Sequence, residues 1–288
     1  MSRWYEEHLV CPQCHEPLSL QTGGCSCGFT VPSTSPLDLR PQRPFRRTID
    51  VHVGGSPASQ LETCRIERPA MTYSGPSALR DSSELFSAIT PWLTPDAKML
   101  DLGCGPRDQA VVAEHYSLRY VGVDYSSPKA DLLADAQSIP FADGTFDVVL
   151  SYAVLEHLYN PFVAIQEVAR VLRPGGACVA VVSQGEPFHD SYFHHTAFGV
   201  LSVLQEARLR PVVMWPSYDT LHALATMGRY PRVLRGLIEV VHRIGKIPLV
   251  APRKFLHWSA REKAVDELHR AASICFVAEK PVTLAYAS

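Results

Sequence analysis

The chain of 288 residues has no excess of either charge, because 27 Lys and Arg stand against 29 Asp and Glu and the formal net charge is −2. This balance gives no overall attraction to nucleic acids or to an anionic membrane. The sequence also lacks a run of about 18 apolar residues, which a membrane-spanning helix needs. Residues 1–14 lack the apolar stretch of a secretory signal. We therefore expect a cytoplasmic protein without nucleic-acid or membrane partners.

Four of the eight cysteines lie close together near the N-terminus, in the pairs Cys11-x2-Cys14 and Cys25-x-Cys27. Without a secretory signal, such pairs indicate a metal site or buried thiols rather than disulfides. Four thiolates with no open coordination position are typical of structural zinc, and the metal would help so short a segment to fold. The second pair is one residue tighter than C-x2-C, so His15 is an alternative fourth ligand. Reduced thiols without a metal are the other interpretation.

The segment over residues 8–41 resembles the short zinc-ribbon module of Trm112-like proteins, in which a C-P-x-C knuckle precedes a second knuckle. The resemblance implies a zinc-ribbon segment over residues 1–41. Residues 42–95 are rich in Pro, Ser, Gly and Arg, which is typical of a linker. One helix is expected there, over residues 81–89, with a capping box at its start and an apolar face. We expect this cap helix to pack near the ligand-binding side of the following domain.

From Lys98 onward, short apolar runs alternate with helical patterns, which predicts an α/β fold with a mainly parallel sheet and crossover helices. The expected strands cover residues 98–103, 120–124, 132–135, 146–151, 177–182, 212–215 and 273–278. Helices are expected over 109–115 and 161–172, and a third begins after Thr196. Asn160 is the expected N-cap of the second helix.

The first of these strands ends in the run LDLGCG (100–105), where the chain turns into a helix. In parallel sheets, ligands bind beyond the carboxyl ends of the strands, and glycines there let the backbone approach a ligand closely. The run is not the dinucleotide pattern G-x-G-x-x-G, and Asp101 would repel a pyrophosphate. A ligand with a cationic amino group suits it better. Asp124, at the end of the next strand, can accept from two ribose hydroxyls.

These features resemble the class I S-adenosylmethionine-dependent methyltransferases, in particular the UbiE-like group called type 11. The matching motifs occur in order over residues 97–184: LDLGCGP, VGVDYS (121–126), ADAQSIPFADGTFD (134–147), VLEHL (154–158) and VLRPGG (171–176). The resemblance implies a Rossmann-like sheet of seven strands, the last of them antiparallel, in a domain over residues 96–288. It also implies S-adenosylmethionine as the cofactor.

By this resemblance, nine residues at the strand ends contact the cofactor: Asp101, Gly103, Gly105, Asp124, Tyr125, Asp135, Ala136, Ser151 and Tyr152. Asp101 would orient the amino group, and Asp124 would bind the ribose. Tyr125 would pack on the adenine, whose edge Asp135 would read together with the following amide. The last two residues would lie near the sulfonium. Two alternatives stay open: Asp135 as a helix or turn cap, and Tyr152 as a core aromatic.

Between the sixth and seventh strands, residues 217–272 form an insertion with helical patterns, far longer than a hairpin needs. We expect it to act, with the cap helix, as a lid that closes the acceptor site. It contains an apolar helical stripe at Leu234, Leu237, Ile238 and Val241. Such a stripe should be buried, either on the rim of the domain or against a second subunit. The insertion is therefore also a candidate homodimer interface.

Four histidines are candidates for the catalytic base. Methyl transfer to a hydroxyl requires removal of a proton, and histidine is the usual base because its pKa lies near working pH. His189, His194 and His195 follow the fifth strand, and His157 follows the fourth. Packing or capping is the alternative role for each of them.

The leading hypothesis is a methyltransferase for a small-molecule acceptor of the sugar or secondary-metabolite type, with O or N as the acceptor atom. One alternative is an rRNA or tRNA base methyltransferase, because a zinc ribbon also precedes the domain in 23S rRNA guanine-N1 methyltransferases. The missing basic stripe argues against that alternative. A second alternative is a catalytically silent module that binds a partner through its zinc knuckle. The intact acids at three strand ends argue against it.

Overall fold

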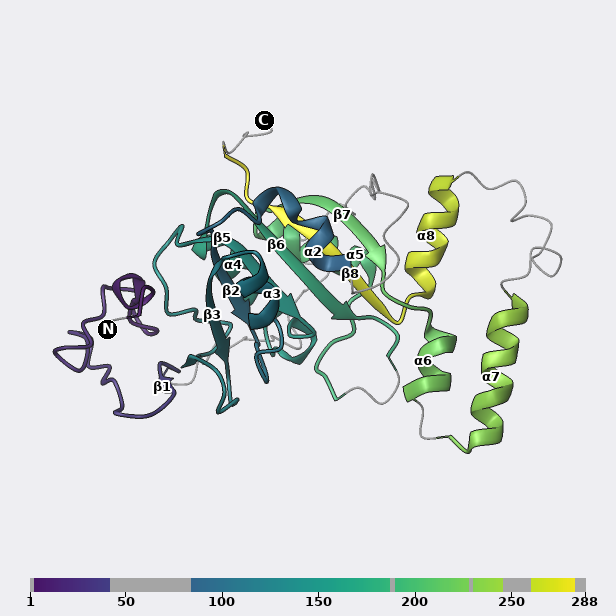
Figure 1. Ribbon diagram of the computed structural model, residues 1–288, viewed down its shortest axis with the longest axis horizontal. Helices are drawn as coiled ribbons and strands as arrows, with labels where there is room; N and C mark the ends of the chain where they lie inside the picture. Colours follow the sequence, from purple (N-terminus) through teal and green to yellow (C-terminus); the bar gives the residue numbers. More distant parts are fainter. Residues whose placement is uncertain (1–2, 42–83, 187–189, 228–229, 246–259, 283–288) are drawn as a thin grey trace, which may run out of the picture.

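The computed structural model describes residues 3–41, 84–186, 190–227, 230–245 and 260–282, and these form an α/β fold around one eight-stranded sheet (Figure 1). The strands are β1 Leu37–Asp38, β2 Lys98–Leu102, β3 Arg119–Asp124, β4 Leu132–Leu133, β5 Phe146–Tyr152, β6 Leu172–Ser183, β7 Arg210–Pro216 and β8 Ser273–Glu279. The helices are α2 Leu85–Ala88, α3 Ala110–His115, α4 Pro161–Val171, α5 Ala197–Glu206, α6 Thr220–Met227, α7 Arg232–Gly245 and α8 Ala260–Arg270. Short 3-10 turns are η1 Glu6–His8, η3 Thr90–Trp92 and η4 Leu155–His157.

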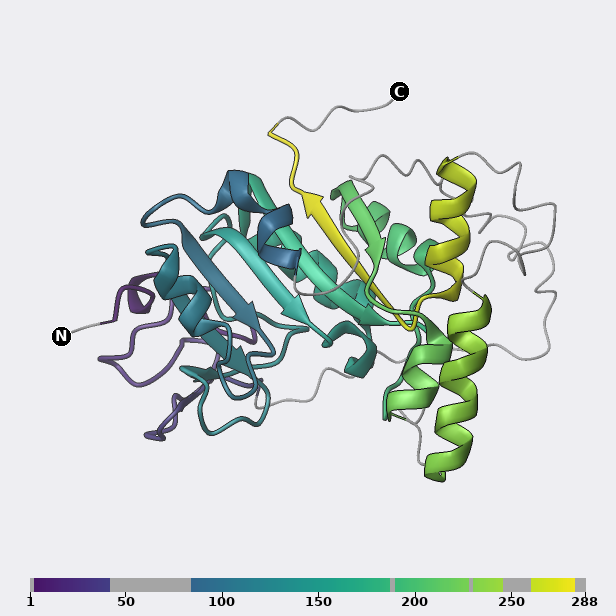
Figure 2. The same ribbon diagram turned by 45° about the vertical axis from the view of Figure 1, so that its right-hand side comes forward.

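The strand order is β1-β4-β3-β2-β5-β6-β8-β7. Strands β2, β5 and β6 are buried along most of their length, because parallel strands with helices on both faces must be apolar on both sides. Helices α4 and α5 pack on one face of the sheet, while α2 and α3 pack on the other (Figure 2). As expected, β8 runs antiparallel to β6 and β7. The α/β class and the Rossmann-like arrangement are thereby confirmed.

Two helix starts are fixed by the side chains that the sequence indicates. The Asn160 side chain accepts from the Val163 amide at 3.3 Å, and Pro161 occupies the first position of α4. The Thr196 hydroxyl accepts from the Gly199 amide at 3.1 Å at the start of α5. These caps satisfy amides that have no partner inside the helix. They set the entry of the chain into α4 and α5.

The expectation of seven strands is wrong, because the N-terminal segment adds an eighth. β1 pairs parallel with β4, and the Leu39 amide continues the pairing with a hydrogen bond of 2.8 Å to the Leu133 carbonyl. Buried side chains of the segment join the same hydrophobic cluster as the sheet: Tyr5, Leu9, Cys11, Leu18, Phe29 and Leu39. The N-terminal segment is thus packed onto the β4 edge and shares a core with the sheet (Figure 1).

The cap helix differs from its expected place. Asp81 lies outside the described residues, and the described helix is α2, with Leu85 buried on the sheet. Phe86 stacks on Tyr116 at the end of α3, and Trp92 Nε1 donates to the Gly175 carbonyl at 2.8 Å. Both partners lie at the amino ends of the strands. The described part of this helix therefore lies near the amino ends of the strands, whereas the ligand-binding edge is at their carboxyl ends.

The insertion is helical, as expected, and consists of α6, α7 and α8 in its described part. It lies at the opposite end of the molecule from the N-terminal segment (Figures 1 and 2). The expected burial of its stripe on the rim of the domain is wrong: Leu234, Leu237 and Val241 are 42%, 58% and 59% exposed, and Ile238 is half-buried. Within the described residues, no helix has the length and apolar character to span a membrane.

Candidate functional site

The loop between β2 and α3 follows the carboxyl end of β2. Because β2 pairs in parallel with β3 on one side and with β5 on the other, the carboxyl ends of all three strands lie at the same edge as this loop. Gly103 has φ 75°, and the Gly103 and Cys104 amides both donate to the Val123 carbonyl, at 2.7 and 3.0 Å. A Cβ at Gly103 would come within 2.3 Å of Val154 Cγ2. Glycine is therefore required here, and the loop is tied to the end of β3.

Asp101 is the buried acid of this loop, with 1% of its surface exposed. Burial raises the pKa of Asp101 to about 6, although the hydrogen bond from Tyr120 opposes the increase. Tyr120 Oη donates to Oδ2 at 2.7 Å and so fixes the carboxylate. The Arg107 guanidinium lies 5.0 Å over the Tyr120 ring and pairs with Asp131. Arg107 thus holds the tyrosine that orients Asp101.

Asp124 ends β3 and joins two loops. Its Oδ2 accepts from the Gly105 amide at 3.0 Å, and its Oδ1 accepts from the Ser126 and Ser127 amides, each at 2.8 Å. The Ser127 hydroxyl returns a short hydrogen bond to the Gly105 carbonyl. A carboxylate oxygen can accept more than one hydrogen bond, so both oxygens keep capacity for further donors. The residue is half-buried and sits where a ribose is expected.

Tyr125, next along the chain, is 61% exposed. The Arg40 guanidinium lies 5.2 Å from the centre of its ring, and Arg40 Nη1 donates to the Tyr125 carbonyl at 3.2 Å. Asp38 of β1 holds Arg40 through two hydrogen bonds, of 2.9 and 2.6 Å. The N-terminal segment therefore places a cation against the residue that is expected to pack on adenine, a contact that the sequence did not indicate.

The loop after β4 carries the expected adenine-reading residues. The Asp135 carboxylate accepts from the Gln137 amide at 2.8 Å, so the alternative role as a turn cap is present in the structure. Ala136 is buried beside it. The N-terminal segment supports this loop, because the Val10 amide donates to the Pro140 carbonyl at 3.2 Å. Two further contacts hold this loop. The Ser138 hydroxyl donates to the Pro12 carbonyl, and Leu9 forms an isolated β-bridge with Phe141.

Ser151 and Tyr152 end β5. Ser151 is 1% exposed, and its hydroxyl has no hydrogen-bond partner within the described parts of the chain. A buried hydroxyl without a partner is costly, so it marks a place where a ligand or water can bind. Tyr152 is 41% exposed, so it is not a core aromatic. Both positions fit the expected lining near the reacting centre.

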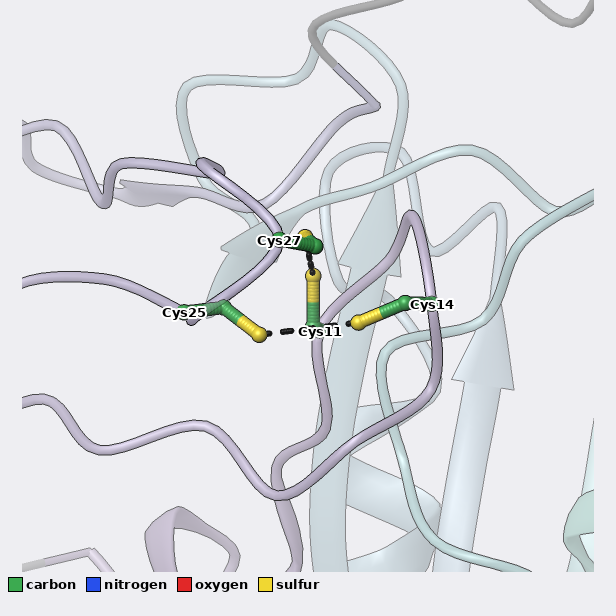
Figure 3. A group of neighbouring side chains, drawn as sticks. All are labelled: Cys11, Cys14, Cys25 and Cys27. Carbon is green, nitrogen blue, oxygen red and sulfur yellow. Dashed lines mark hydrogen bonds between the residues drawn. The ribbon is translucent and has the colours of Figure 1, made fainter.

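The four N-terminal cysteines converge on one point (Figure 3). Their sulfur atoms all lie within 4.8 Å of one another, and the Cys11–Cys27 and Cys14–Cys25 pairs are each 3.5 Å apart. Sulfurs around a tetrahedral zinc, each about 2.3 Å from the metal, are about 3.8 Å apart. The cluster therefore fits a closed four-thiolate site, and the tight C-x-C pair reaches it.

The alternative of His15 as the fourth ligand is not needed, because all four cysteine sulfur atoms reach the site. His15 points elsewhere, with its Nε2 3.7 Å from the Glu167 carboxylate. The Cys27 amide lowers the pKa of Cys25 to about 7, whereas burial raises the pKa of Cys11 to about 12. A buried thiol becomes a thiolate readily only when a cation compensates its charge. The donor set and the burial of Cys11 both suit zinc.

The four candidate histidines differ in their surroundings. His189 lies outside the described residues, and His157 and His194 are exposed. His195 is 6% exposed, and burial lowers its pKa although its ring is hydrogen-bonded to the Leu155 carbonyl. Its Nε2 has no hydrogen-bond partner among the residues that the structure describes. His195 therefore combines a lowered pKa with a buried Nε2 that has no described hydrogen-bond partner.

Two further acids lie at this edge and were missed by the sequence analysis. Glu156 is fully buried in the VLEHL motif and accepts from the Ser183 amide at 3.0 Å. Glu186, just beyond β6, accepts from the Tyr218 hydroxyl at 2.6 Å and from the Ser273 hydroxyl at 2.9 Å. The position of Glu156 in a recognised motif could have indicated it. Glu186 had no local signal, because its partners lie more than thirty residues away along the chain.

Comparisons with known proteins agree with this geometry. Residues 100–180 match the type 11 family model described as a methyltransferase domain. Over 108 residues the chain is 35% identical to an uncharacterized methyltransferase of Mycobacterium sp. (strain JLS), covering 34% of this chain and 43% of that relative. The chain thus spans less than half the length of this relative.

Two relatives with more specific names also match. An O-methyltransferase of Pyrenophora dematioidea is 23% identical over 248 residues, 70% of this chain and 88% of that protein. The 27-O-demethylrifamycin SV methyltransferase of Amycolatopsis mediterranei (strain S699) is 33% identical over 97 residues, 27% of this chain and 36% of that protein. The sheet order, the glycine turn after a buried acid and the family match lead to one assignment. Residues 100–180 match a methyltransferase domain of type 11, and they lie in a sheet of Rossmann-like arrangement.

Proposed function

We propose that the protein transfers a methyl group from S-adenosylmethionine to a small-molecule acceptor, with oxygen or nitrogen as the acceptor atom. The observation that carries this proposal is the buried Asp101, oriented by Tyr120 beside the obligatory turn at Gly103. An oriented carboxylate suits an ammonium group and not a pyrophosphate. Binding of S-adenosylmethionine, measured by titration calorimetry, tests the proposal. No binding at millimolar cofactor would exclude it.

Each part of the cofactor has a counterpart at the strand ends. Asp101 orients the ammonium group, and Asp124 accepts from the ribose hydroxyls. Tyr125 covers the adenine, backed by Arg40, and the Asp135 turn with the Ala136 amide reads its edge. When bound, the cofactor supplies an electrophilic methyl group. The protein's part is to position it and to exclude water.

We propose His195 as the general base for a hydroxyl acceptor. A base must be uncharged and must have a nitrogen that no other group occupies; the lowered pKa of His195 favours the neutral ring, and its buried Nε2 has no described partner. The hydrogen bond between the ring and the Leu155 carbonyl fixes the ring. His157 and His194 stay as exposed alternatives on the same edge.

Exposed aromatic side chains support a small acceptor with a planar or apolar part. Four of them are 41–66% exposed and lie at the end of β5 or on the segments that follow β5 and β6: Tyr152, Tyr159, Tyr192 and Phe193. The Tyr192 and Phe193 amides both donate to the Glu156 carbonyl, which joins these segments. The Tyr159 and Tyr192 rings meet edge to face at 6.0 Å. Aromatic rings of this kind bind planar ligands by stacking. The O-methyltransferases among the relatives are consistent with an oxygen acceptor.

We further propose that residues 217–272 help to define the acceptor site. Tyr218 opens the insertion and Ser273 follows it, and both donate to Glu186 at the end of β6. The base of the insertion is thereby fixed to the edge that carries His195. The four-cysteine cluster, for its part, is proposed to hold one structural zinc ion.

Cofactor affinity should depend on pH through Asp101. Its pKa is raised to about 6, so the carboxylate is ionised above this pH and protonated below it. Because the ammonium group of the cofactor binds the ionised form, affinity should fall as pH decreases through about 6, by up to about tenfold per pH unit. Calorimetry between about pH 5 and pH 7 measures this. Asp101→Asn should bind weakly at every pH, and a flat profile in the wild type would contradict the assignment.

Asp124→Ala should weaken cofactor binding by at least about tenfold, because two charge-assisted hydrogen bonds to the ribose are lost. The variant also frees the Gly105 and Ser126 amides, so its thermal unfolding must be recorded beside its affinity. Glu206→Ala, at an exposed acid of α5, is the matched control. An Asp124→Ala protein that is folded and binds normally would refute the ribose assignment.

A further inference from the structure

Helix α7 has its polar side against the protein and its apolar side outward. Among the residues of α7 whose burial is described, Arg235, Ile238 and Glu239 are half-buried, and the Glu239 carboxylate lies 3.4 Å from His222 of α6. The opposite side carries six exposed apolar side chains: Val233 (77%), Leu234 (42%), Leu237 (58%), Val240 (51%), Val241 (59%) and Ile244 (44%). A surface helix of a globular protein normally has the reverse orientation. The outward side of α7 therefore calls for a partner.

The stretch of sequence that contains this helix is strongly basic, although the overall charge of the chain is nearly balanced. Residues 228–261 contain eight Lys and Arg and one Asp or Glu, a net charge of +7. With a formal net charge of −2 for the whole chain, the remaining residues carry −9. On α7 itself, Arg232 and Arg243 are exposed, and the single acid, Glu239, is already engaged by Arg243 at 3.1 Å and by His222. The partner of this surface should therefore be apolar and negatively charged.

We propose that the outward side of α7 is a docking surface for an anionic lipid bilayer. A helix with a continuous apolar side and arginines along its polar side lies in the plane of a bilayer interface, with its apolar side chains among the acyl chains. Arginine stems extend along apolar surface while their guanidinium groups reach the phosphates. Anionic headgroups attract nearby Lys and Arg, and these attractions add. Such a helix does not span the bilayer, so the docking is peripheral.

A second copy of this chain suits the surface less well. A helix of 14 residues is about 21 Å long and about 10 Å across, so its side offers about 200 Å². Stable dimers bury about 800 Å² on each partner. Pairing two copies through α7 would also bring the arginine-bearing flanks of both helices together, and like charges across an interface oppose binding. A bilayer has neither restriction.

The surface lies apart from the cofactor loops, although α7 belongs to the insertion that is proposed to help define the acceptor site. Among the described elements, α7 packs mainly on α6, at the end of the molecule opposite the cysteine cluster (Figures 1 and 2). The cofactor loops lie between residues 100 and 152. Docking can therefore be measured without cofactor or acceptor, and its outcome does not depend on the proposed methyl transfer.

The test is flotation of the full-length protein with vesicles of phosphatidylcholine, either pure or with about one third phosphatidylglycerol. We expect the wild type to float with the anionic vesicles, to float much less with the neutral ones, and to be released by high salt. Leu237→Glu/Val240→Glu should reduce vesicle binding at least about tenfold, because it places charges in the apolar side. Val111→Glu, at a side chain 71% exposed on α3, should bind like the wild type.

Circular dichroism and cofactor binding verify that each variant is folded. Failure of the wild type to float with anionic vesicles overturns the proposal, as does equal binding by Leu237→Glu/Val240→Glu. A further outcome is that light scattering shows a dimer for the wild type and a monomer for the double variant, while neither protein floats. In that case the surface is an interface between copies of the chain, and the proposal is wrong. Equal flotation with neutral vesicles overturns the electrostatic part.

Discussion

Replacing Cys11 and Cys14 with Ser is expected to remove the metal and to unfold the N-terminal segment. Binding of a structural zinc contributes apparent free energies of about 10–16 kcal/mol, whereas a whole domain is stable by about 5–15 kcal/mol. Residues 3–41 contain one strand of two residues and short turns, so apart from the side chains packed on the sheet they have little secondary structure to keep them folded without the metal. Metal analysis of protein purified without chelator should give one zinc per wild-type chain and none for the double variant.

The loss should extend to the cofactor loop. Without the metal, the Val10 and Pro12 contacts to residues 138–140 and the Arg40 contact to Tyr125 are released, so S-adenosylmethionine affinity should also decrease several-fold. Cys178→Ala, at a buried thiol of β6, is the matched control and should keep its zinc. A Cys11→Ser/Cys14→Ser protein with full zinc content would show that other groups hold the metal. Hydrogen exchange confined to residues 3–41 would confirm local unfolding.

His195→Gln should lower kcat by about 100- to 10,000-fold, which is the range for loss of a positioned general base. Cofactor affinity should change little, because His195 belongs to the acceptor side of the proposed site. The wild-type rate should fall as pH decreases through the lowered pKa of His195, since the base acts in its neutral form. The His195→Gln variant should lose this pH dependence of the rate, but it should keep the pH dependence of cofactor affinity that arises from Asp101.

His157→Gln and His194→Gln provide the comparison. Both side chains are exposed on the same edge, and each variant should keep its activity within about fivefold if His195 is the base. A large loss in either of them, with normal activity in His195→Gln, would move the assignment to that residue. If the acceptor atom is a nitrogen that is already neutral, no base is needed, and all three histidine variants should keep most of their activity. Identifying the acceptor by activity screening shows whether this case applies.

Local patterns were sufficient to predict most of the sheet and the glycine turn that follows β2. Apolar runs that end in Asp101 and Asp124 gave strands in the expected places, because a buried parallel strand must be apolar on both faces. The turn at Gly103 followed from the chemistry of a strand-to-helix junction. The four cysteines were predictable from spacing, and their sulfurs converge as a four-thiolate site requires.

Contacts between distant segments were not predictable. β1 has two residues and no alternation of its own, so its pairing with β4 depends on the edge that it meets. The Tyr120–Asp101 and Arg40–Tyr125 contacts each join residues that no local pattern connects. For α7, the apolar stripe correctly predicted an amphipathic helix, but periodicity cannot say which side faces the protein. The expectation of burial on the rim of the domain failed at this point, whereas burial against a second subunit stays a prediction.

The shared core of the N-terminal segment and the sheet also determines the order of assembly during synthesis. Cys11 to Cys27 are synthesised more than a hundred residues before Phe141, which belongs to the same hydrophobic cluster as Cys11 and Leu18. At about 5–20 residues per second, this interval is on the order of ten seconds. Throughout it, four thiols lie open to oxidants and metals with no hydrophobic partner. Capture of a metal ion in this interval would close them before the sheet exists, and the finished sheet edge then encloses a segment that is already folded.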